Sequence, residues 1–422
     1  MKPAARVLSL STVAFTLLFA VWLMFGVLGV PIKEEFHLDT VQFSWLTAIA
    51  VLSGSIWRLP LGIWTDRVGG RRLMTFLLLA TAVPTLLVSH ATTFTQLMVC
   101  AFCFGIAGNS FSVGIAWNAA WADRDRQGFA LGIFGAGNVG ASITKLIGPA
   151  LIALVPAGGM GLIPGGWRGV PVLYAALLVL MAAVLWVATP APDRHPGSGR
   201  PLRALLAPLR EVRTWRFGLY YVVVFGAYVA LSLWLPSYYK RVFGLPLAKA
   251  ALLTALFIFP ASLLRPVGGW LSDKFGARPV TYAVFVAMLL ACVPLAAPDG
   301  ALGFHVGLSQ FILLIEVLGI GMGLGKASVY KYIADYFPNE VGAAGGLVGT
   351  LGALGGFVLP LGLGYLDKSS GRPESCFWIM GALVLACLVW LHTVVSGMRR
   401  RATVRVPALP VDAVTDQLGA GA

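Results

Sequence analysis

The sequence predicts an all-α membrane protein in which twelve transmembrane helices form two pseudo-symmetric halves of six. The chain has 422 residues, of which 58% are hydrophobic and only 11% are charged, whereas a soluble domain carries about 25% charged residues. Its apolar segments reach the roughly 20 helical residues that a bilayer requires. A motif in the first half also recurs in the second half, which indicates an internal repeat.

Twelve apolar segments meet the length criterion, six on each side of a segment rich in Pro, Arg and Gly. The expected spans cover residues 8–31, 41–64, 73–90, 95–121, 128–155, 170–188, 215–239, 248–271, 280–297, 306–335, 342–366 and 375–397. The first run is too long for the apolar core of a signal peptide, so we interpret it as a span. The expected organisation is an N-terminal half at 1–189, a linker at 190–214, a C-terminal half at 215–398 and a tail at 399–422.

The net charge of +14 comes mainly from Lys and Arg in the N-terminus, the linker, the tail and the loops of one membrane side. This distribution follows the positive-inside rule, so both termini are expected in the cytoplasm and no nucleic-acid partner is expected. Cys100 and Cys103 have C-x-x-C spacing, but an apolar helix does not suit zinc or redox chemistry. Because no nucleophile, metal cluster or acid/base pair is evident, the sequence predicts no enzyme, metal site or cofactor.

The repeated motif carries an arginine inside each of two apolar runs. It reads R-L-P-L-G-I-W-T-D-R-V-G-G-R-R from Arg58 and R-P-V-G-G-W-L-S-D-K-F-G-A-R from Arg265, and Asp66 aligns with Asp273 without a gap. Each arginine precedes its aspartate by eight residues, which is roughly 12 Å of helix. Both arginines therefore lie near the midplane, where a charge costs about 2.5 kcal/mol or more and indicates function.

A guanidinium stays protonated and presents a planar fork of donors that matches a flat oxyanion. Arg58 and Arg265, one in each half and without a carboxylate at the same depth, favour a small anionic substrate over a cation or a neutral sugar. At the cytoplasmic end of the motif, Asp66, Arg67 and Asp273 are expected to act in gating, as an inner latch.

Three lysines also lie in the expected spans. Lys326 lies near the midplane, where it can either exchange a proton and couple proton movement to anion movement or act as a third fixed positive charge. Lys331 is a second coupling candidate, although it is close enough to the cytoplasm to reach water. Lys145 is expected near the outer edge of its span, without a special role.

Spans five and eleven form a matching pair rich in glycine. Small residues let membrane helices approach closely, so packing explains most of these glycines. We expect some to give the surfaces on which the halves move. The expected members are Gly135, Gly137, Gly140, Gly346 and Gly349.

Several motifs carry a family resemblance. Gly62–Arg72, with a weaker copy at Gly269–Arg278, resembles the signature loop of the major facilitator superfamily. Ala130–Ser142 reads A-L-G-I-F-G-A-G-N-V-G-A-S and resembles the glycine-rich signature of the nitrate/nitrite porter (NarK) family, as does Gly105–Phe111 for span four. Residues 344–357 are similar to the second signature of that family.

The resemblance implies a major facilitator fold in the bacterial inner membrane and a planar anion held between the halves. The implied binding residues are Arg58, Arg265, Phe111, Asn138, Tyr221 and Phe225. The implied function is nitrate import by a monomeric secondary transporter, with nitrite as a further substrate and protons as the favoured coupling ion. The alternatives are a nitrate/nitrite antiporter, a transporter of another small organic or inorganic anion, and a non-transporting receptor on the same fold.

Overall fold

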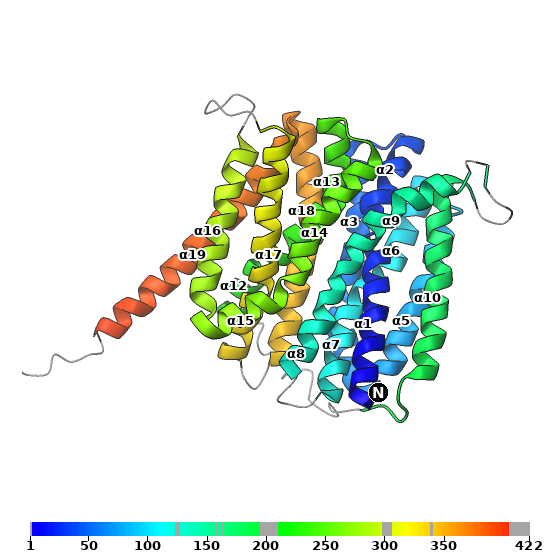
Figure 1. Cartoon of the computed structure of the whole chain (residues 1–422). Helices are drawn as coiled ribbons and strands as arrows, with labels where there is room; N and C mark the ends of the chain where they lie inside the picture. The colour runs from blue at the N-terminus through cyan, green and yellow to red at the C-terminus, as the bar shows by residue number, and fades with distance from the viewer. Residues whose placement is uncertain are drawn as a thin grey trace, which may run out of the picture.

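The computed structural model describes residues 2–122, 127–156, 158–159, 161, 164–194, 210–297, 306–337 and 341–404. Over these ranges the regular structure is helical, and twelve helical segments are long and apolar enough to cross a membrane. Figure 1 shows them as one bundle whose N-terminus lies at one end, here called the N-terminal end. The predicted fold class of twelve transmembrane helices is confirmed.

Most spans of the first half are built from two or three helical segments. The elements are α1 (Pro3–Trp22), α2 (Phe25–Glu35), α3 (Thr40–Ile56), α4 (Arg58–Val68), α5 (Gly70–Val88), α6 (Phe94–Phe104), η1 (Gly105–Asn109), α7 (Ser110–Trp121), α8 (Gln127–Ala136), η3 (Gly137–Val139), α9 (Gly140–Leu154), η4 (Gly166–Arg168) and α10 (Gly169–Ala188). The charged turn expected at 123–126 lies outside the described residues.

The second half also has six spans. Its elements are α12 (Val212–Tyr221), the π-helical turn η6 (Val222–Gly226), α13 (Ala227–Phe243), α14 (Leu247–Leu263), α15 (Arg265–Phe275), α16 (Ala277–Ala296), α17 (Leu308–Tyr336), α18 (Val341–Ser370), η8 (Pro373–Ser375) and α19 (Cys376–Val404). Unlike most spans of the first half, α16, α17 and α18 each form a span as one continuous helix. Residues 195–209 of the expected linker and 405–422 of the expected tail lie outside the described part. Helix α19 continues beyond residue 398, the expected end of the C-terminal half, and ends at Val404.

The local chemistry of the sequence explains where several helices begin. Asp39 caps α3, where its carboxylate accepts from the amide of Gln42 at 2.7 Å in a capping box. Gly69 and Gly276 connect α4 to α5 and α15 to α16 with φ values of 89° and 85°. Only glycine adopts this conformation readily, so the repeated glycine of the motif is a requirement of the turn.

Within each half the helices pack closely because glycines stand where they cross. A Cβ atom on Gly140 would lie 2.0 Å from the carbonyl oxygen of Thr16. The pseudo-symmetric pair Gly105 and Gly319 lies against the backbone in the same way, at 2.3 and 2.8 Å from carbonyl oxygens. Across the halves α3 contacts α18, α9 contacts α14, and α2 contacts α13. The packing role expected of small residues thus has a direct steric basis.

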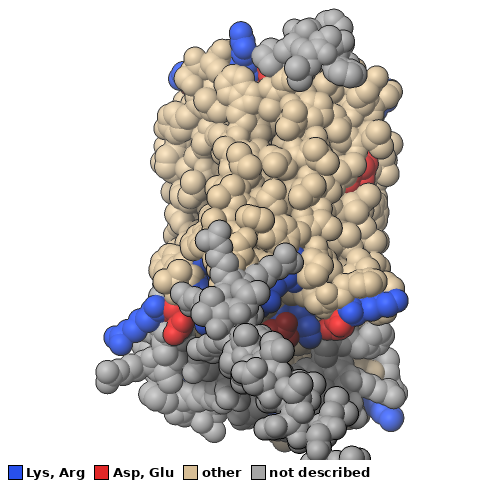
Figure 2. Space-filling model, turned by 90° about the vertical axis from the view of Figure 1, so that its left-hand side faces the viewer, with Lys and Arg blue, Asp and Glu red and all other residues tan. Residues whose placement is uncertain are grey.

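Charged side chains gather mainly at the two ends of the bundle, and a broad belt of mostly uncharged surface separates them on the face that Figure 2 shows, with acidic atoms at its right-hand edge. At the end opposite the N-terminus, two ion pairs join the halves: Glu34 with Lys240, and Asp39 with Lys368 at 3.0 Å. At the N-terminal end, Lys331 pairs with Asp273 at 3.0 Å within the second half. The belt fits the hydrocarbon layer of a membrane.

Candidate functional site

The arginines of the repeated motif each begin a helix in the middle of a span. Helix α3 ends at Ile56 and α4 begins with Arg58, while α14 ends at Leu263 and α15 begins with Arg265. The N-terminus of a helix carries about half a positive charge. At each break the negative C-terminus of one helix meets the positive N-terminus of the next, so the two ends largely offset each other and the positive charge comes from the arginines themselves.

Arg58 is held in a fixed position but is not saturated with hydrogen bonds. Its side chain is only 2% exposed. The Nε atom donates to the carbonyl of Gly54 at 3.0 Å, and Nη1 donates across the halves to the carbonyl of Gly349 at 3.4 Å. The Nη2 atom is buried and has no hydrogen-bond partner among the described residues. The Nη2 donor of the guanidinium thus remains available to a ligand.

Aromatic rings form the walls around the two arginines. The guanidinium carbon of Arg58 lies 5.3 Å from the ring centroid of Phe225, 5.5 Å from Trp22 and 5.9 Å from Phe111. The guanidinium carbon of Arg265 lies 5.5 Å from the same Phe111 ring. One aromatic ring therefore lies near the cations of both halves, which places the two arginines in one region.

Arg265 and Asn138 supply further unpaired donors. The Nη1 atom of Arg265 is buried without a partner in the described part of the chain. A Cβ atom on Gly135 would lie 3.3 Å from this Nη1, so Arg265 reaches from the second half to α8 of the first. Asn138 is 1% exposed, and both of its amide atoms are buried and unpaired among the described residues. An unpaired buried polar group costs about 1–3 kcal/mol, which an anion between these donors would remove.

Tyrosines complete the same region. Tyr221 stacks on Phe225 with ring centroids 5.1 Å apart and planes at 10°, and Tyr330 meets Tyr221 edge-on at 5.2 Å. Tyr330 interacts electrostatically with both Arg58 and Arg265, and its hydroxyl donates to a carbonyl of α18 at 3.2 Å. The sequence analysis missed Tyr330 and Trp22. The signal for Tyr330 was its spacing of four residues from Lys326, which places both on one helix face.

Lys326 lies at the edge of this site. Its side chain is fully buried, and Nζ donates to the carbonyl of Ala261 at 2.9 Å. The same Nζ atom lies 3.2 Å from the ring centroid of Tyr228 and 5.7 Å from that of Phe225. Because Phe225 also faces Arg58, a single ring separates this lysine from the arginine pair. The depth expected from the sequence matches this position.

The other predicted residues lie apart from the arginines. Lys331 has a side chain that is 34% exposed, and it also pairs with Asp335 at 3.4 Å. Arg67 is exposed in the last turn of α4, and the side chain of Asp66 lies outside the described residues. Gly137 contacts α1, whereas Gly346 and Gly349 lie on α18 near Leu59 and Tyr330. These glycines surround the site rather than bind within it.

Lys145 differs from its expected position at the edge of the span. Its side chain is fully buried, and Nζ donates to the carbonyl of Leu23 at 3.3 Å, at the break between α1 and α2. That break exposes a backbone oxygen in the interior, which the residue count along a straight helix does not reveal.

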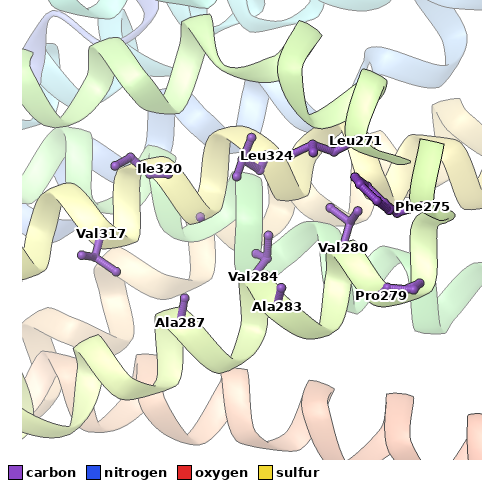
Figure 3. Close-up of a pocket in the computed structure, with 11 residues that line it drawn as sticks. Leu271, Phe275, Pro279, Val280, Ala283, Val284, Ala287, Val317, Ile320 and Leu324 are labelled. Atoms are coloured by element: carbon purple, nitrogen blue, oxygen red, sulfur yellow. The ribbon is translucent and has the colours of Figure 1, made fainter. Parts of the chain in front are cut away.

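A separate groove of about 480 Å³ lies among α15, α16 and α17. Figure 3 shows its lining, which consists of apolar side chains such as Phe275, Val280, Ile320 and Leu324. It offers no charged or polar side chain and so does not suit an anion.

Comparison with known proteins agrees with this geometry. The family model described as Major Facilitator Superfamily matches residues 10–314 and 247–413. A Thermus thermophilus protein named "Probable nitrate/nitrite antiporter NarK1" is 60% identical over 404 residues, which cover 92% of this chain and 91% of that protein. A Bacillus subtilis "Nitrite extrusion protein" is 30% identical over 390 residues, covering 91% of this chain and 94% of its own.

The fold is also found in a solved structure. The crystal structure of a bacterial homologue of the human lysosomal transporter Spinster, inward-facing and occupied, matches with a TM-score of 0.71 at 18% identity. The match covers 93% of this chain and 96% of that one, and it supports the fold alone. Together with the relatives above, these matches show that the chain belongs to the NarK family of nitrate/nitrite transporters in the major facilitator superfamily.

Proposed function

We propose that the protein imports nitrate across the bacterial inner membrane by proton symport, with both termini in the cytoplasm, and that it works as a monomer. The observation that carries this proposal is the set of buried donors without partners on Arg58, Arg265 and Asn138. These donors come from both halves, and no carboxylate pairs with either arginine within the described residues. A small planar anion is the ligand that satisfies them.

Nitrate fits because its oxygens lie in one plane, as do the donors of each guanidinium. Arg58 and Arg265 hold the anion from opposite halves, and Asn138 and Tyr221 give directional hydrogen bonds. Phe111 and the stacked rings of Tyr221 and Phe225 close the apolar sides. A phosphate ester or a dicarboxylate is bulkier than nitrate, so inhibition of labelled nitrate uptake by either that is as strong as inhibition by unlabelled nitrate would count against this substrate.

Binding drives the conformational change through charge. The two arginines repel each other when the site is empty, because each half brings one cation to the shared Phe111 ring. A bound anion removes that repulsion and lets the halves close around it. Gly346 lies against Leu59 of the opposite half and Gly135 lies against Arg265, so small residues keep these moving surfaces smooth. Asp66, Arg67 and Asp273 latch the cytoplasmic side.

Lys326 couples protons to the anion. A positive charge on Lys326 attracts nitrate, so nitrate in turn favours the protonated lysine, and the two ligands bind cooperatively. When nitrate leaves to the cytoplasm the proton follows it, because the two ligands bind cooperatively. We assign Lys331 to the cytoplasmic latch, because it pairs with Asp273 rather than facing the arginines.

Nitrate/nitrite exchange is the second candidate. The Thermus thermophilus relative, which is named as a probable nitrate/nitrite antiporter, favours it. In that mechanism Lys326 stays charged and serves as a third fixed cation. Nitrite is planar as well, so the same arginine pair would bind it. The two mechanisms differ only in whether the empty carrier returns by losing a proton or by binding nitrite.

Uptake of labelled nitrate into proteoliposomes separates them. Under symport, an acidic outside drives accumulation without internal nitrite, and Lys326→Gln and Lys326→Arg both abolish that accumulation. Lys274→Gln, which changes an exposed cation on α15, should leave it intact. Uptake that requires internal nitrite and ignores the pH gradient would refute symport and establish exchange.

A further inference from the structure

A second group of cations lies in the second half, toward the N-terminal end of the bundle. Arg213 and Arg216 come from α12 and Arg278 from the first turn of α16. The guanidinium carbon of Arg213 lies 5.2 Å from the ring centroid of Tyr336, and Arg278 donates from Nη2 to the Tyr336 hydroxyl at 2.6 Å. Arg216 precedes Phe225 by nine residues, which is roughly 13 Å of helix. This cluster is therefore distinct from the nitrate site.

Arg216 is the buried centre of the cluster. Its side chain is 7% exposed, and its Nε atom is buried without a hydrogen-bond partner among the described residues. The hydroxyl of Tyr220, one helical turn further along α12, is buried and unpaired in the same part of the chain. Arg216 interacts electrostatically with both Tyr220 and Tyr332, whose rings lie 6.4 Å apart. Arg278 also interacts with Tyr332, so the buried and exposed arginines face one region.

Acidic groups near the cluster do not neutralise it. None of its arginines has a carboxylate within 4.0 Å in the described ranges. Asp335 interacts with Arg278 from a greater distance but pairs with Lys331, and Glu211 is exposed at the start of α12. A buried arginine without a counter-ion is costly, so the cluster calls for an anion.

Arg213 and Arg278 need no bound anion, because both side chains are exposed and can reach water at the membrane surface. The same does not hold for Arg216, which protein atoms cover. The exposed pair instead forms the rim of a site whose floor is Arg216 and Tyr220. Trp215, half-exposed beside this floor, is the residue type that marks the level of lipid headgroups.

We propose that Arg216, Arg278 and Tyr220, with Arg213 at the rim, bind the phosphate group of an anionic phospholipid. A phosphate offers several acceptor oxygens and pairs strongly with guanidinium groups. A free phosphate ion has the same chemistry, but the position of Trp215 favours a lipid. The next residue after Tyr220 is Tyr221 of the nitrate site, so an occupied site would stabilise the helix that carries Tyr221.

The test is lipid retention on the purified full-length protein, measured by native mass spectrometry with phosphatidylglycerol and phosphatidylcholine. The wild type should retain phosphatidylglycerol in preference, and Arg216→Gln should weaken that retention about tenfold. Tyr220→Phe removes one hydroxyl and should weaken it by about threefold. Lys274→Gln, a cation at the same end but outside the cluster, should match the wild type.

Equal retention by Arg216→Gln and Lys274→Gln, both confirmed as folded by size-exclusion chromatography, would overturn the proposal. Inorganic phosphate distinguishes the two sources of the anion. If phosphate alone raises the melting temperature of the wild type but not of Arg216→Gln, and the two lipids are retained equally, the lipid assignment is wrong. Because lipid retention is measured without nitrate, its failure is separate from failure of the transport proposal.

Discussion

Replacement of Arg58 by lysine tests the anion site most directly, because it keeps the charge and removes the fork. In the structure the Nε and Nη1 atoms of Arg58 are bound to the carbonyls of Gly54 and Gly349, and Nη2 remains for the ligand. A lysine ammonium has its donors at a single point. It would have to leave a carbonyl unpaired in order to bind the anion.

The expected loss follows from the hydrogen bonds involved. A hydrogen bond to a charged group contributes about 1.5–3 kcal/mol. Since about 1.4 kcal/mol corresponds to a factor of ten in the dissociation constant, loss of one such bond should weaken nitrate binding by about 10- to 100-fold. Arg265→Lys should lose a similar amount, because its Nη1 is also buried and unpaired among the described residues.

Isothermal titration of purified protein with nitrate measures this constant without requiring transport. Arg168→Lys is the matched control, because Arg168 lies at the opposite end of the bundle in an exposed pair with Glu35. Its dissociation constant should match that of the wild type. If the dissociation constant changed by less than about threefold in both Arg58→Lys and Arg265→Lys, the claim that the guanidinium fork binds nitrate would be refuted. The loss of even one charged hydrogen bond should change the constant by more than that.

Three further predictions follow from the packing and the ion pairs. Tyr330→Phe should raise the KM for nitrate by about three- to tenfold with normal expression, because it removes a hydroxyl beside both arginines; an unchanged KM would exclude Tyr330 from the site. Gly140→Ala should lower the yield of folded protein, because its Cβ would lie 2.0 Å from a carbonyl oxygen of α1, and such overpacking costs about 1–3 kcal/mol. Gly132→Ala, with nothing within 4 Å, should be neutral, and equal yields would contradict the steric argument. The pKa of Asp39 is lowered because a backbone amide in the first turn of α3 and then Lys368 stabilise its carboxylate. The stability that the Asp39 carboxylate contributes is therefore fully present above its ordinary pKa of about 4, and it is lost only as the pH falls below that value. Distances between spin labels placed on the two halves near Asp39 and Lys368 should stay constant from about pH 5 to 8. A change in these distances within that range would show that this surface ion pair responds to pH.

The spans and the arginine pair could be predicted because bilayer thickness and the cost of a buried charge act on local sequence. Arg58 and Arg265 can be recognised from the sequence because each is a charged residue within an apolar run. Tyr330 could not be found in this way, because a tyrosine in a membrane helix is ordinary until its neighbours are known. The burial of Lys145 depends on the break between α1 and α2, which a count along a straight helix misses. The family resemblance was needed for Asn138, whose amide appears unusual only once its missing partners are seen.

The ion pairs between the halves affect the conformational equilibrium of the transporter when no substrate is bound. Glu34–Lys240 and Asp39–Lys368 are exposed, and exposed pairs contribute only about 0–1 kcal/mol each. These ion pairs therefore add only a shallow electrostatic preference to closure at that end, where α2 also packs on α13 and α3 on α18. Such a preference is screened by salt over a Debye length of about 8 Å. Ionic strength would then act as a control on which side the empty carrier faces, independently of the substrate it carries.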